Sequence, residues 1–397
     1  MRSLHILTLT TLFPNSVQPL NAIFVRNRME AVVRCHGHRW TVVAPVPYYP
    51  KFPFRTLGAY DTFARVPYRE EPWGYPLYHP RYLVTPKFGM RYYGAWMTLG
   101  VRNLVRRLHA RTPFDVIDGH YVYPDGTAAV RLGRELGIPV ILSARGTDLN
   151  LYPRLPGIAQ RIRDNLTRCR HLICVCGELK QEALKLGMPE DRISVIGNGV
   201  DVERFRRLDR VPARRALGLP LEGALVLSVG HMTERKGFHL LLRAFAAMNR
   251  PDASLVIVGD GPQRAELEAL RRELGLERRV FFPGAVRNED LAAWYSAANL
   301  FVLSSSREGW PNVLCEAQAI GLPVVATRVW GIPEIVTDPS LGILVEERSA
   351  ESLRTAISTA LSNSWDSAHI ERVGRSRTWD KVAGEVERVI AGVAVPP

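Results

Sequence analysis

Short apolar runs alternate with amphipathic segments along the first half of the chain. The apolar runs are rich in Val, Ile and Leu, which is typical of strands buried on both faces of a parallel sheet. The segments between them repeat apolar residues every three or four positions, which predicts helices packed on that sheet. The predicted strands are residues 4–13, 38–46, 114–120, 138–146, 171–176 and 192–200. The predicted helices are residues 22–35, 101–111, 125–137 and 177–187.

The same alternation begins again after a charged, proline-punctuated segment, residues 201–222, which we interpret as a domain linker. The second set of strands is 224–230, 253–261, 279–286, 300–306 and 322–327. The second set of helices is 237–248, 262–274, 288–298 and 311–321. This order predicts an α/β protein with two Rossmann-like, doubly wound domains. Two such domains predict a cleft between the carboxyl ends of their strands, where ligands of open sheets bind.

Residues 47–100 depart from this pattern, because they are rich in Pro, Tyr and Arg and have no clear period. They predict long loops with helical pieces, which are a usual place for a variable binding surface.

Composition narrows the class of protein. A chain of 397 residues with 46% hydrophobic residues favours two folded domains over disorder. Its five cysteines have no framework spacing, which argues against a disulfide scaffold. We interpret Cys174 and Cys176 as small buried residues and not as a metal pair, because no second Cys or His pair has ligand spacing.

Charge is unevenly distributed along the chain. Residues 1–210 hold 31 Lys and Arg against 17 Asp and Glu, whereas residues 211–397 hold 21 against 22. An anionic membrane surface, an anionic substrate and a solvated Arg-rich surface each fit this excess. Nucleic acid is not expected as a partner, because the basic residues are scattered and no recognition motif accompanies them.

The apolar start of the chain, residues 1–13, lacks a small-x-small cleavage pattern, so it predicts a buried strand and not a signal peptide. No stretch reaches the roughly 18 apolar residues of a spanning helix. We therefore expect a cytoplasmic protein, with peripheral contact to the inner face of the cell membrane.

Residues 307–317, with the sequence REGWPNVLCEA, place two glutamates around the start of a predicted helix. Pro311 suits the first turn of that helix, where a missing N–H costs nothing, and Gly321 suits its end. Backbone N–H groups at a helix start attract anions, and carboxylates accept hydrogen bonds from hydroxyls. The pattern fits a ligand with a phosphate between polyhydroxyl groups, such as a nucleotide-sugar. The alternative is that Glu308 caps the helix and Glu316 is solvated.

Residues 304–336, SSSREGWPNVLCEAQAIGLPVVATRVWGIPEIV, contain both glutamates, and an Arg-Lys-Gly run lies upstream in VGHMTERKGF. Further motifs in order along the chain are DGHYVYPDGTAA, LSARGTDLN, GNGVD, IVGDGP and FPGAV. Over nearly the whole chain these segments resemble retaining glycosyltransferases of family 4, which have the GT-B fold. The resemblance implies an acceptor-binding domain over residues 1–205 and a donor-binding domain over residues 206–379. A C-terminal helix near 380–397 is expected to pack back on the first domain.

The resemblance also implies roles for residues of the donor site. The matching positions are Ala22, His231, Arg235, Lys236, Ala285, Val286, Glu308, Gly309, Trp310, Pro311, Asn312, Val313 and Glu316. Glu308 matches the glutamate on the donor-sugar hydroxyls, and Glu316 matches the one on the ribose hydroxyls. Lys236 matches the lysine on the diphosphate. Arg235, its neighbour, is alternatively a solvated side chain.

His120 matches the cleft histidine near the anomeric carbon, so the implied catalytic residues are His120, Glu308 and Lys236. Without its neighbours in the motif, His120 would be interpreted as a strand-end histidine bonded locally. Arg145 and Asp148 lie on a strand-end loop that suits the acceptor.

Two positions depart from the family pattern. Ala22 stands where the family often has glycine, and a methyl group there narrows the approach of the backbone to a phosphate. His231 stands where the family often has arginine, so a permanent positive charge is lost.

The implied reaction is transfer of a sugar from a nucleotide-diphosphate sugar to a glycan or lipid-linked acceptor, with retained anomeric configuration. The family suggests bacterial cell-surface polysaccharide or glycolipid synthesis. No paired acidic motif sits in a metal-binding context, so we expect no metal and no cofactor besides the nucleotide-sugar. Two alternatives stay open: a non-catalytic GT-B protein that binds glycan or nucleotide, and a nucleotide-sugar epimerase.

Overall fold

The computed structural model describes residues 2–48, 59–85 and 89–394. The chain divides into two compact units, one of residues 1–198 with 379–397 and one of residues 199–378. This division falls a few positions before the boundary at 205–206 that we predicted from the sequence.

The first unit is built on an eight-stranded sheet in the order β10-β9-β8-β7-β1-β2-β5-β4, which is parallel except between β4 and β5. Its strands are β1 (His5–Leu9), β2 (Arg39–Val43), β4 (Arg69–Glu70), β5 (Leu77–Tyr78), β7 (Val116–His120), β8 (Val140–Ala144), β9 (His171–Cys174) and β10 (Ile193–Val195), with a separate pair β3 (Val46–Tyr48) and β6 (Arg81–Leu83). Its helices are α1 (Ile23–His36), α2 (Ala59–Arg65), α3 (Tyr93–Arg111), α4 (Asp125–Leu136), α5 (Thr147–Asn150), α6 (Ala159–Arg168), α7 (Gly177–Lys185) and α15 (Trp379–Ala394). Every residue of β1, β7 and β8 is buried, which explains why these strands are mostly apolar and why Asp118 and His120 of β7 need polar partners.

The segment that we predicted as long loops, residues 47–100, contains short strands and the first turns of α3, while residues 49–58 and 86–88 of it lie outside the described residues. Helix α3 begins at Tyr93, well before its predicted start at 101. Two glycines hid the helical pattern, and both are needed for close packing. A Cβ on Gly94 would lie 2.5 Å from Thr127, and one on Gly100 would lie 2.4 Å from a backbone oxygen.

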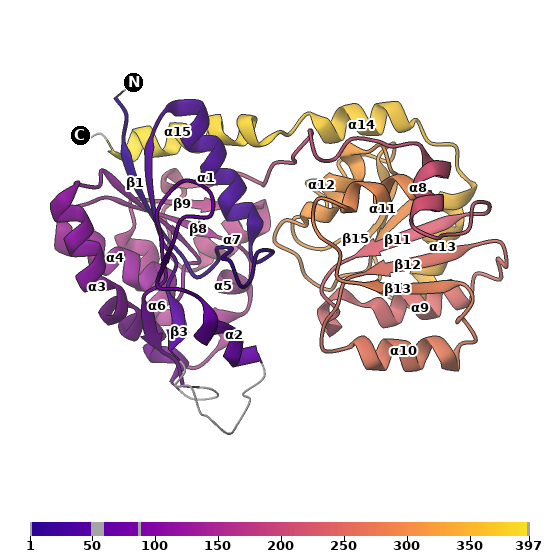
Figure 1. Ribbon diagram of the computed structural model, residues 1–397, viewed down its shortest axis with the longest axis horizontal. Coiled ribbons are helices and arrows are strands. Elements are labelled where there is room, and N and C mark those ends of the chain that lie inside the picture. The colour runs from indigo at the N-terminus through magenta and orange to yellow at the C-terminus, as the bar shows by residue number, and fades with distance from the viewer. Residues whose placement is uncertain (1, 49–58, 86–88, 395–397) are drawn as a thin grey trace. The chain divides into compact units, whose positions relative to one another are not determined.

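The C-terminal helix α15 belongs to the first unit and packs along α1 (Figure 1). Val386 and Ile390 of α15 share a core with Met29 of α1. His38 Nε2 also contacts Glu387 Oε2 at 2.7 Å, with both side chains buried. The helix that we expected near 380–397 therefore starts at Trp379, and residues 395–397 lie outside the described part of the chain.

The second unit is built on a parallel six-stranded sheet in the order β13-β12-β11-β14-β15-β16. Its strands are β11 (Leu225–Val229), β12 (Ser254–Val258), β13 (Val280–Gly284), β14 (Leu300–Leu303), β15 (Val324–Thr327) and β16 (Gly342–Val345). Its helices are α8 (Arg210–Ala216), α9 (Phe238–Ala246), α10 (Arg264–Glu273), α11 (Leu291–Ala297), α12 (Asn312–Ala319), α13 (Ala350–Ser362) and α14 (Ser367–Arg375).

Helices cover both faces of this second sheet. Leu225, Leu227 and Val229 join a core with α8, α11, α12 and α14, whereas Val226 joins a separate core with α9, α10 and α13. Figure 1 shows α9 and α10 on the face opposite α11 and α12. Alternate residues of β11 point to opposite faces, so this is the doubly wound arrangement that the sequence predicted.

Residues 201–222 are not a linker, because they pack on the second unit and include α8. Phe205 lies in the core, and Arg214 is only 2% exposed. The Arg214 guanidinium donates hydrogen bonds to Asn299 Oδ1 at 2.6 Å and to the carbonyl oxygens of Ala297, Pro220, Leu221 and Gly223. The charge-rich composition was misleading, since one of these arginines is a buried group whose guanidinium ties together several carbonyl oxygens and Asn299.

We expect Arg214→Met to lower the free energy of unfolding of the second unit by roughly 1–3 kcal/mol, because it removes the hydrogen bonds that the buried guanidinium donates to five acceptors. Chemical denaturation would measure the change. The matched control is Arg215→Met on the exposed side of α8, which should change stability by no more than about 0.5 kcal/mol. Equal effects of the two substitutions would contradict the structural role of Arg214.

Candidate active site

The segment that carries the two glutamates lies between β14 and α12 in the second unit. Pro311 is the N-cap of α12, with φ −77° and ψ 98°, and the helix begins at Asn312. Gly321 follows the helix with φ +77°, and an added Cβ would lie 2.5 Å from the carbonyl oxygen of Ser367. The start and the end that we predicted for this helix are confirmed.

Glu308 is a buried carboxylate that is shared by two cations. Its Oε1 accepts hydrogen bonds from Lys236 Nζ at 2.6 Å and Ser305 Oγ at 2.7 Å. Its Oε2 lies 2.9 Å from a guanidinium nitrogen of Arg235. Burial opposes ionisation, but the charges of Lys236 and Arg235 outweigh it and hold the pKa of Glu308 below its usual value. Glu308 is thus paired with two cations, and Arg235, whose side chain is 38% exposed, is an ion-pair partner that also reaches solvent.

Two loops must approach closely for this cluster to form. Lys236 ends a short turn after β11, and the next residue, Gly237, has φ +68°. A Cβ on Gly237 would lie 2.4 Å from the carbonyl oxygen of Ser304, in the loop after β14. Ser304 Oγ donates to the carbonyl of Lys236 at 2.9 Å, and the amide of Ser306 donates to the carbonyl of Arg235 at 2.8 Å. The glycine is therefore required by contact as well as by backbone angle.

The cluster of Arg235, Lys236 and Glu308 holds one more positive than negative charge. It adjoins the turn of Gly309 and Trp310 that leads into the start of α12. The first N–H groups of a helix have no partner within the helix itself, and the positive end of the helix dipole lies there. The arrangement thus suits an anionic group such as a diphosphate.

Glu316 lies inside α12 and is bonded to a neighbouring helix. Its Oε2 accepts a 2.7 Å hydrogen bond from the hydroxyl of Tyr295 in α11. Burial raises the pKa of Glu316 to about 7, although the Tyr295 hydroxyl and Arg204 oppose this shift. The interpretation of Glu316 as a solvated side chain is therefore wrong.

The remaining predicted donor residues follow neighbouring strands. His231 comes two residues after β11 and is exposed, while Ala285 and Val286 come directly after β13. Val286 packs against the core, and Ala285 is exposed. All three lie at the carboxyl edge of the sheet that also carries Lys236 and Glu308, where ligands of open α/β sheets bind.

In the first unit, Ala22 is the N-cap of α1 and has left-handed backbone angles, φ 47° and ψ 42°. A non-glycine residue in this conformation costs about 1–2 kcal/mol, which gives a physical reason for the glycine that the family often has here.

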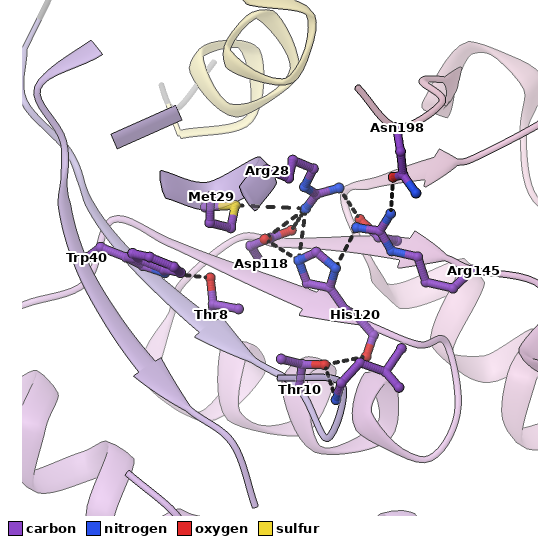
Figure 2. Close-up of polar contacts among 11 residues, drawn as sticks. Thr8, Thr10, Arg28, Met29, Trp40, Asp118, His120, Arg145 and Asn198 are labelled. Atoms are coloured by element: carbon purple, nitrogen blue, oxygen red, sulfur yellow. Dashed lines mark hydrogen bonds and ion pairs between the residues drawn. The ribbon is translucent and has the colours of Figure 1, made fainter. Parts of the chain in front are cut away.

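His120 ends β7 and is fully buried in a network of polar side chains (Figure 2). Its Nδ1 lies 2.7 Å from a guanidinium nitrogen of Arg145, which can only donate, so Nδ1 accepts. Nε2 lies between two partners, Asp118 Oδ2 at 2.7 Å and a guanidinium nitrogen of Arg28 at 2.9 Å. Arg28 donates to both Asp118 oxygens, at 2.8 and 2.9 Å. Burial, with Arg28 and Arg145, lowers the pKa of His120 to about 3 despite the opposing charge of Asp118, so the ring is neutral.

His120 is thus bonded locally, as the alternative interpretation expected, and its place at the reaction centre stays a prediction. Arg145 joins this network and donates to Asn198 Oδ1 at 3.0 Å. The carboxylate of Asp148 instead links two loops of the first unit. It accepts hydrogen bonds from the backbone amides of Arg145 and Gly146, which follow β8, and of Val122, which follows β7. Contact of Arg145 or Asp148 with an acceptor also stays a prediction.

Three residues of these networks were missed from the sequence: Arg28, Asp118 and Tyr295. Arg28 lies among the apolar positions of α1, next to Met29, and an arginine on the inward stripe of a helix signals a buried partner. Tyr295 lies on an inward position of α11, where a buried hydroxyl needs a hydrogen-bond partner.

Comparisons with known proteins agree with this geometry. Residues 22–204 match the family model "Glycosyltransferase Family 4", and residues 209–377 match "Glycosyl transferases group 1". The chain is 28% identical to the putative teichuronic acid biosynthesis glycosyltransferase TuaC of Bacillus subtilis, over 89% of this chain and 88% of that protein. It is 33% identical to the lipopolysaccharide core biosynthesis glycosyltransferase LpsE of Rhizobium meliloti, over 59% of this chain and 60% of that protein.

Solved structures share the fold. Sucrose-phosphate synthase from Thermosynechococcus elongatus superposes with a TM-score of 0.77 at 22% identity, covering 98% of this chain and 99% of that one. Anabaena Alr3699/HepE, solved in complex with UDP and glucose, gives 0.73 at 19% identity, covering 98% and 100%. Taken with the two matched domains, these likenesses show that the chain belongs to the family 4 glycosyltransferases and has the GT-B fold.

Proposed function

We propose that the protein is a retaining glycosyltransferase that moves a sugar from a nucleotide-diphosphate sugar to an acceptor hydroxyl. The observation that carries this proposal is the cluster of buried Lys236 and Glu308 with half-buried Arg235 beside the start of α12. Its pathway would be bacterial cell-surface polysaccharide or glycolipid synthesis, which the names of TuaC and LpsE support. The UDP and glucose bound to Alr3699/HepE support a nucleotide-sugar donor.

The chemical task in this reaction is to stabilise the negative charge that develops on the leaving diphosphate. Lys236 and Arg235 supply fixed positive charge, and the start of α12 supplies N–H donors that need no rearrangement. Glu308 holds both cations in place and offers its carboxylate to a sugar hydroxyl. We propose that this charge is sufficient, so the reaction needs no divalent metal.

Glu316 is proposed to bind the ribose. One oxygen of the Glu316 carboxylate is held by the hydroxyl of Tyr295. That hydroxyl is itself fixed in position, because the buried Tyr295 ring packs against Phe205 and Phe301. The second carboxylate oxygen has no hydrogen bond within the described residues, so it is available to a ligand hydroxyl.

The proposed function is tested by incubating the full chain, in buffer with EDTA, with UDP-, GDP- and ADP-sugars and a glycan acceptor. Transfer with the same anomeric configuration in donor and product is expected, as seen by NMR. Lys236→Ala should slow turnover roughly 10²–10³-fold at saturating donor, by analogy with the loss of one preorganised donor.

The control for this experiment is Lys185→Ala, on the exposed surface of α7, which should leave turnover unchanged. Release of free or epimerised sugar without transfer would favour the epimerase alternative, and loss of activity in EDTA would overturn metal independence. Normal turnover of the Lys236 variant would contradict the role of the cluster.

Nucleotide binding should depend on pH through Glu316. Because its pKa is about 7, the carboxyl is protonated at pH 6 and ionised at pH 8, and only the ionised form accepts with both oxygens. We expect affinity for the free nucleotide diphosphate to rise from pH 6 to pH 8 in calorimetry. Glu316→Gln should flatten this rise and weaken binding at pH 8 by about 1.5–3 kcal/mol.

Glu273→Gln, at an exposed end of α10, serves as the control, since it should keep the full pH dependence. An unchanged pH profile in the Glu316 variant would show that another group titrates.

We also propose peripheral contact with an anionic membrane on the inner face of the cell. Among the described residues no helix is long and apolar enough to cross a membrane. Helix α3, however, has an outer face with Leu99, which is 70% exposed, and Tyr92 at its N-cap, which is 40% exposed. Five arginines lie on or beside this helix, namely Arg91, Arg102, Arg106, Arg107 and Arg111, with one carboxylate, Glu135, as a recorded ion-pair partner.

Sedimentation with vesicles tests this contact. Vesicles with phosphatidylglycerol should pellet the protein at low salt, and the effect should fade as the Debye length shortens. Arg106→Gln combined with Arg107→Gln should lower partitioning roughly 30-fold, from about 1 kcal/mol per basic residue. The control is Leu221→Asp on the second unit, an exposed site outside α3. Equal pelleting with neutral and anionic vesicles would remove the proposal.

A further inference from the structure

A pocket of about 260 Å³ opens in the first unit at the carboxyl ends of β1 and β2. It is lined by the loop after β1, by the loop after β2 and by three side chains from later in the chain. The lining residues are Thr11, Phe13, Asn15, Gln18, Asn21, Ala44, Pro45, Val46, Pro47, Phe63, His79 and Tyr82. Neither the comparisons nor the donor cluster assign a ligand to this pocket.

The loop after β1 is held in shape by its own polar groups. Thr11 donates from its amide and from its hydroxyl to the buried carboxylate of Asp125. Asn15 Oδ1 accepts from the amides of Val17 and Gln18, at 3.0 and 2.8 Å. Asn21 Nδ2 donates to the carbonyl of Phe13 at 3.2 Å. The lining is therefore preorganised and does not need to form when a ligand binds.

Four polar groups of the lining make no hydrogen bond to the described part of the protein. Within the described residues, no hydrogen bond involves Asn15 Nδ2, Asn21 Oδ1, the Gln18 side-chain amide or the Tyr82 hydroxyl. Asn15 is 2% exposed and Tyr82 is 8% exposed, so most of each residue is buried and only a small part of its surface is accessible. Donors and acceptors are mixed in this set, which matches a ligand whose groups both donate and accept, namely hydroxyls.

The described lining of the pocket offers no unpaired charge to an anion. Among the residues that the structure describes there, none is Lys, Arg, Asp or Glu. The imidazole of His79 faces two acceptors, because Nδ1 contacts the carbonyl of Ala44 and Nε2 contacts the Glu70 carboxylate, each at 2.9 Å, so any charge on the ring is already paired with Glu70. A carboxylate or phosphate placed here would be desolvated without a counter-charge, which is costly.

Much of the remaining lining consists of apolar side chains that contain a ring. These are the flat aromatic rings of Phe13 and Phe63 and the rigid rings of Pro45 and Pro47. Its volume is below the roughly 300–1,000 Å³ of pockets for drug-sized ligands, which suits one monosaccharide ring and excludes a nucleotide.

We propose that this pocket binds one uncharged sugar ring of the acceptor. The assignment as an acceptor rests on the proposed function, whereas the preference for a neutral sugar rests on the lining alone. Asn15, Gln18 and Asn21 would contact the hydroxyls, and Phe13 or Phe63 would cover the apolar face of the ring.

The test is saturation-transfer NMR titration of the full chain with methyl glycosides of glucose, galactose, mannose and N-acetylglucosamine, against glucuronate and glucose 6-phosphate. At least one neutral glycoside should bind ten-fold or more tightly than both anions. Asn15→Asp keeps the acceptor for the Val17 and Gln18 amides but replaces a donor with a carboxylate. It and Gln18→Ala should each weaken that glycoside roughly tenfold, the effect of about one hydrogen bond.

Gln181→Ala, an exposed amide on α7, is the matched control and should bind like the parent chain. Calorimetric binding of nucleotide diphosphate is measured on each variant, both as a check of folding and to separate the two proposals. Binding of the anions as tightly as the glycosides, no glycoside binding, or insensitivity to both substitutions would overturn the pocket assignment. Pocket-dependent glycoside binding in a chain that binds no nucleotide would leave the sugar site standing and contradict the proposed function.

Discussion

Glu308 is a buried carboxylate that must be paired, and the candidate donor site is arranged around this requirement. An unpaired buried carboxylate would cost several kcal/mol, so Lys236 and Arg235 have to reach it. They come from the loop after β11, whereas Glu308 follows β14, and the two strands are neighbours in the parallel sheet. Parallel pairing brings the two loops to one edge, and the close contact of Gly237 with Ser304 fixes their separation. Because one carboxylate neutralises only one of two cations, the pairing that stabilises the loops also leaves positive charge for a ligand.

The first unit also contains a buried carboxylate that must be paired, that of Asp118, but its partners are arranged differently. Asp118 at the end of β7 is buried with Arg28 and His120, and Arg145 lies on the far side of the imidazole. Here too the cations outnumber the carboxylate, but most of their donors are bonded to Ser143, Asn198, the imidazole and the carboxylate itself. The surplus charge keeps His120 neutral and fixed. We therefore regard this network as one that positions the strand ends, in contrast to the donor cluster beside α12.

Sequence reasoning succeeded where chemistry is local. Pro311 and Gly321 mark the bounds of α12 because each acts through its own backbone, and buried strands show as apolar runs because both faces are covered. It failed where one residue serves a distant one. Lys236 and Glu308 are 72 positions apart, and Tyr295 and Glu316 are 21 apart. Arg214 appeared to be part of a polar linker because no composition rule separates a buried arginine that donates to five acceptors from one in solvent. The family resemblance supplied the donor-site positions but not these supporting partners.

The basic excess of the first half shows why a charge count needs a structure. Several of these basic residues are bonded within the protein. Arg28 pairs with Asp118, and Arg81 donates to the carbonyls of Phe63 and Val66. Arg192 donates to the carbonyl of Arg170. Other basic side chains stay exposed, among them Arg106, Arg107 and Arg111 of α3. Such charge acts over a Debye length, about 8 Å at physiological salt, without contact. The polar groups of the pocket act only at hydrogen-bond distance. A basic helix that attracts an anionic surface and an uncharged pocket that selects a sugar are therefore compatible in one unit, because the two interactions operate over different ranges.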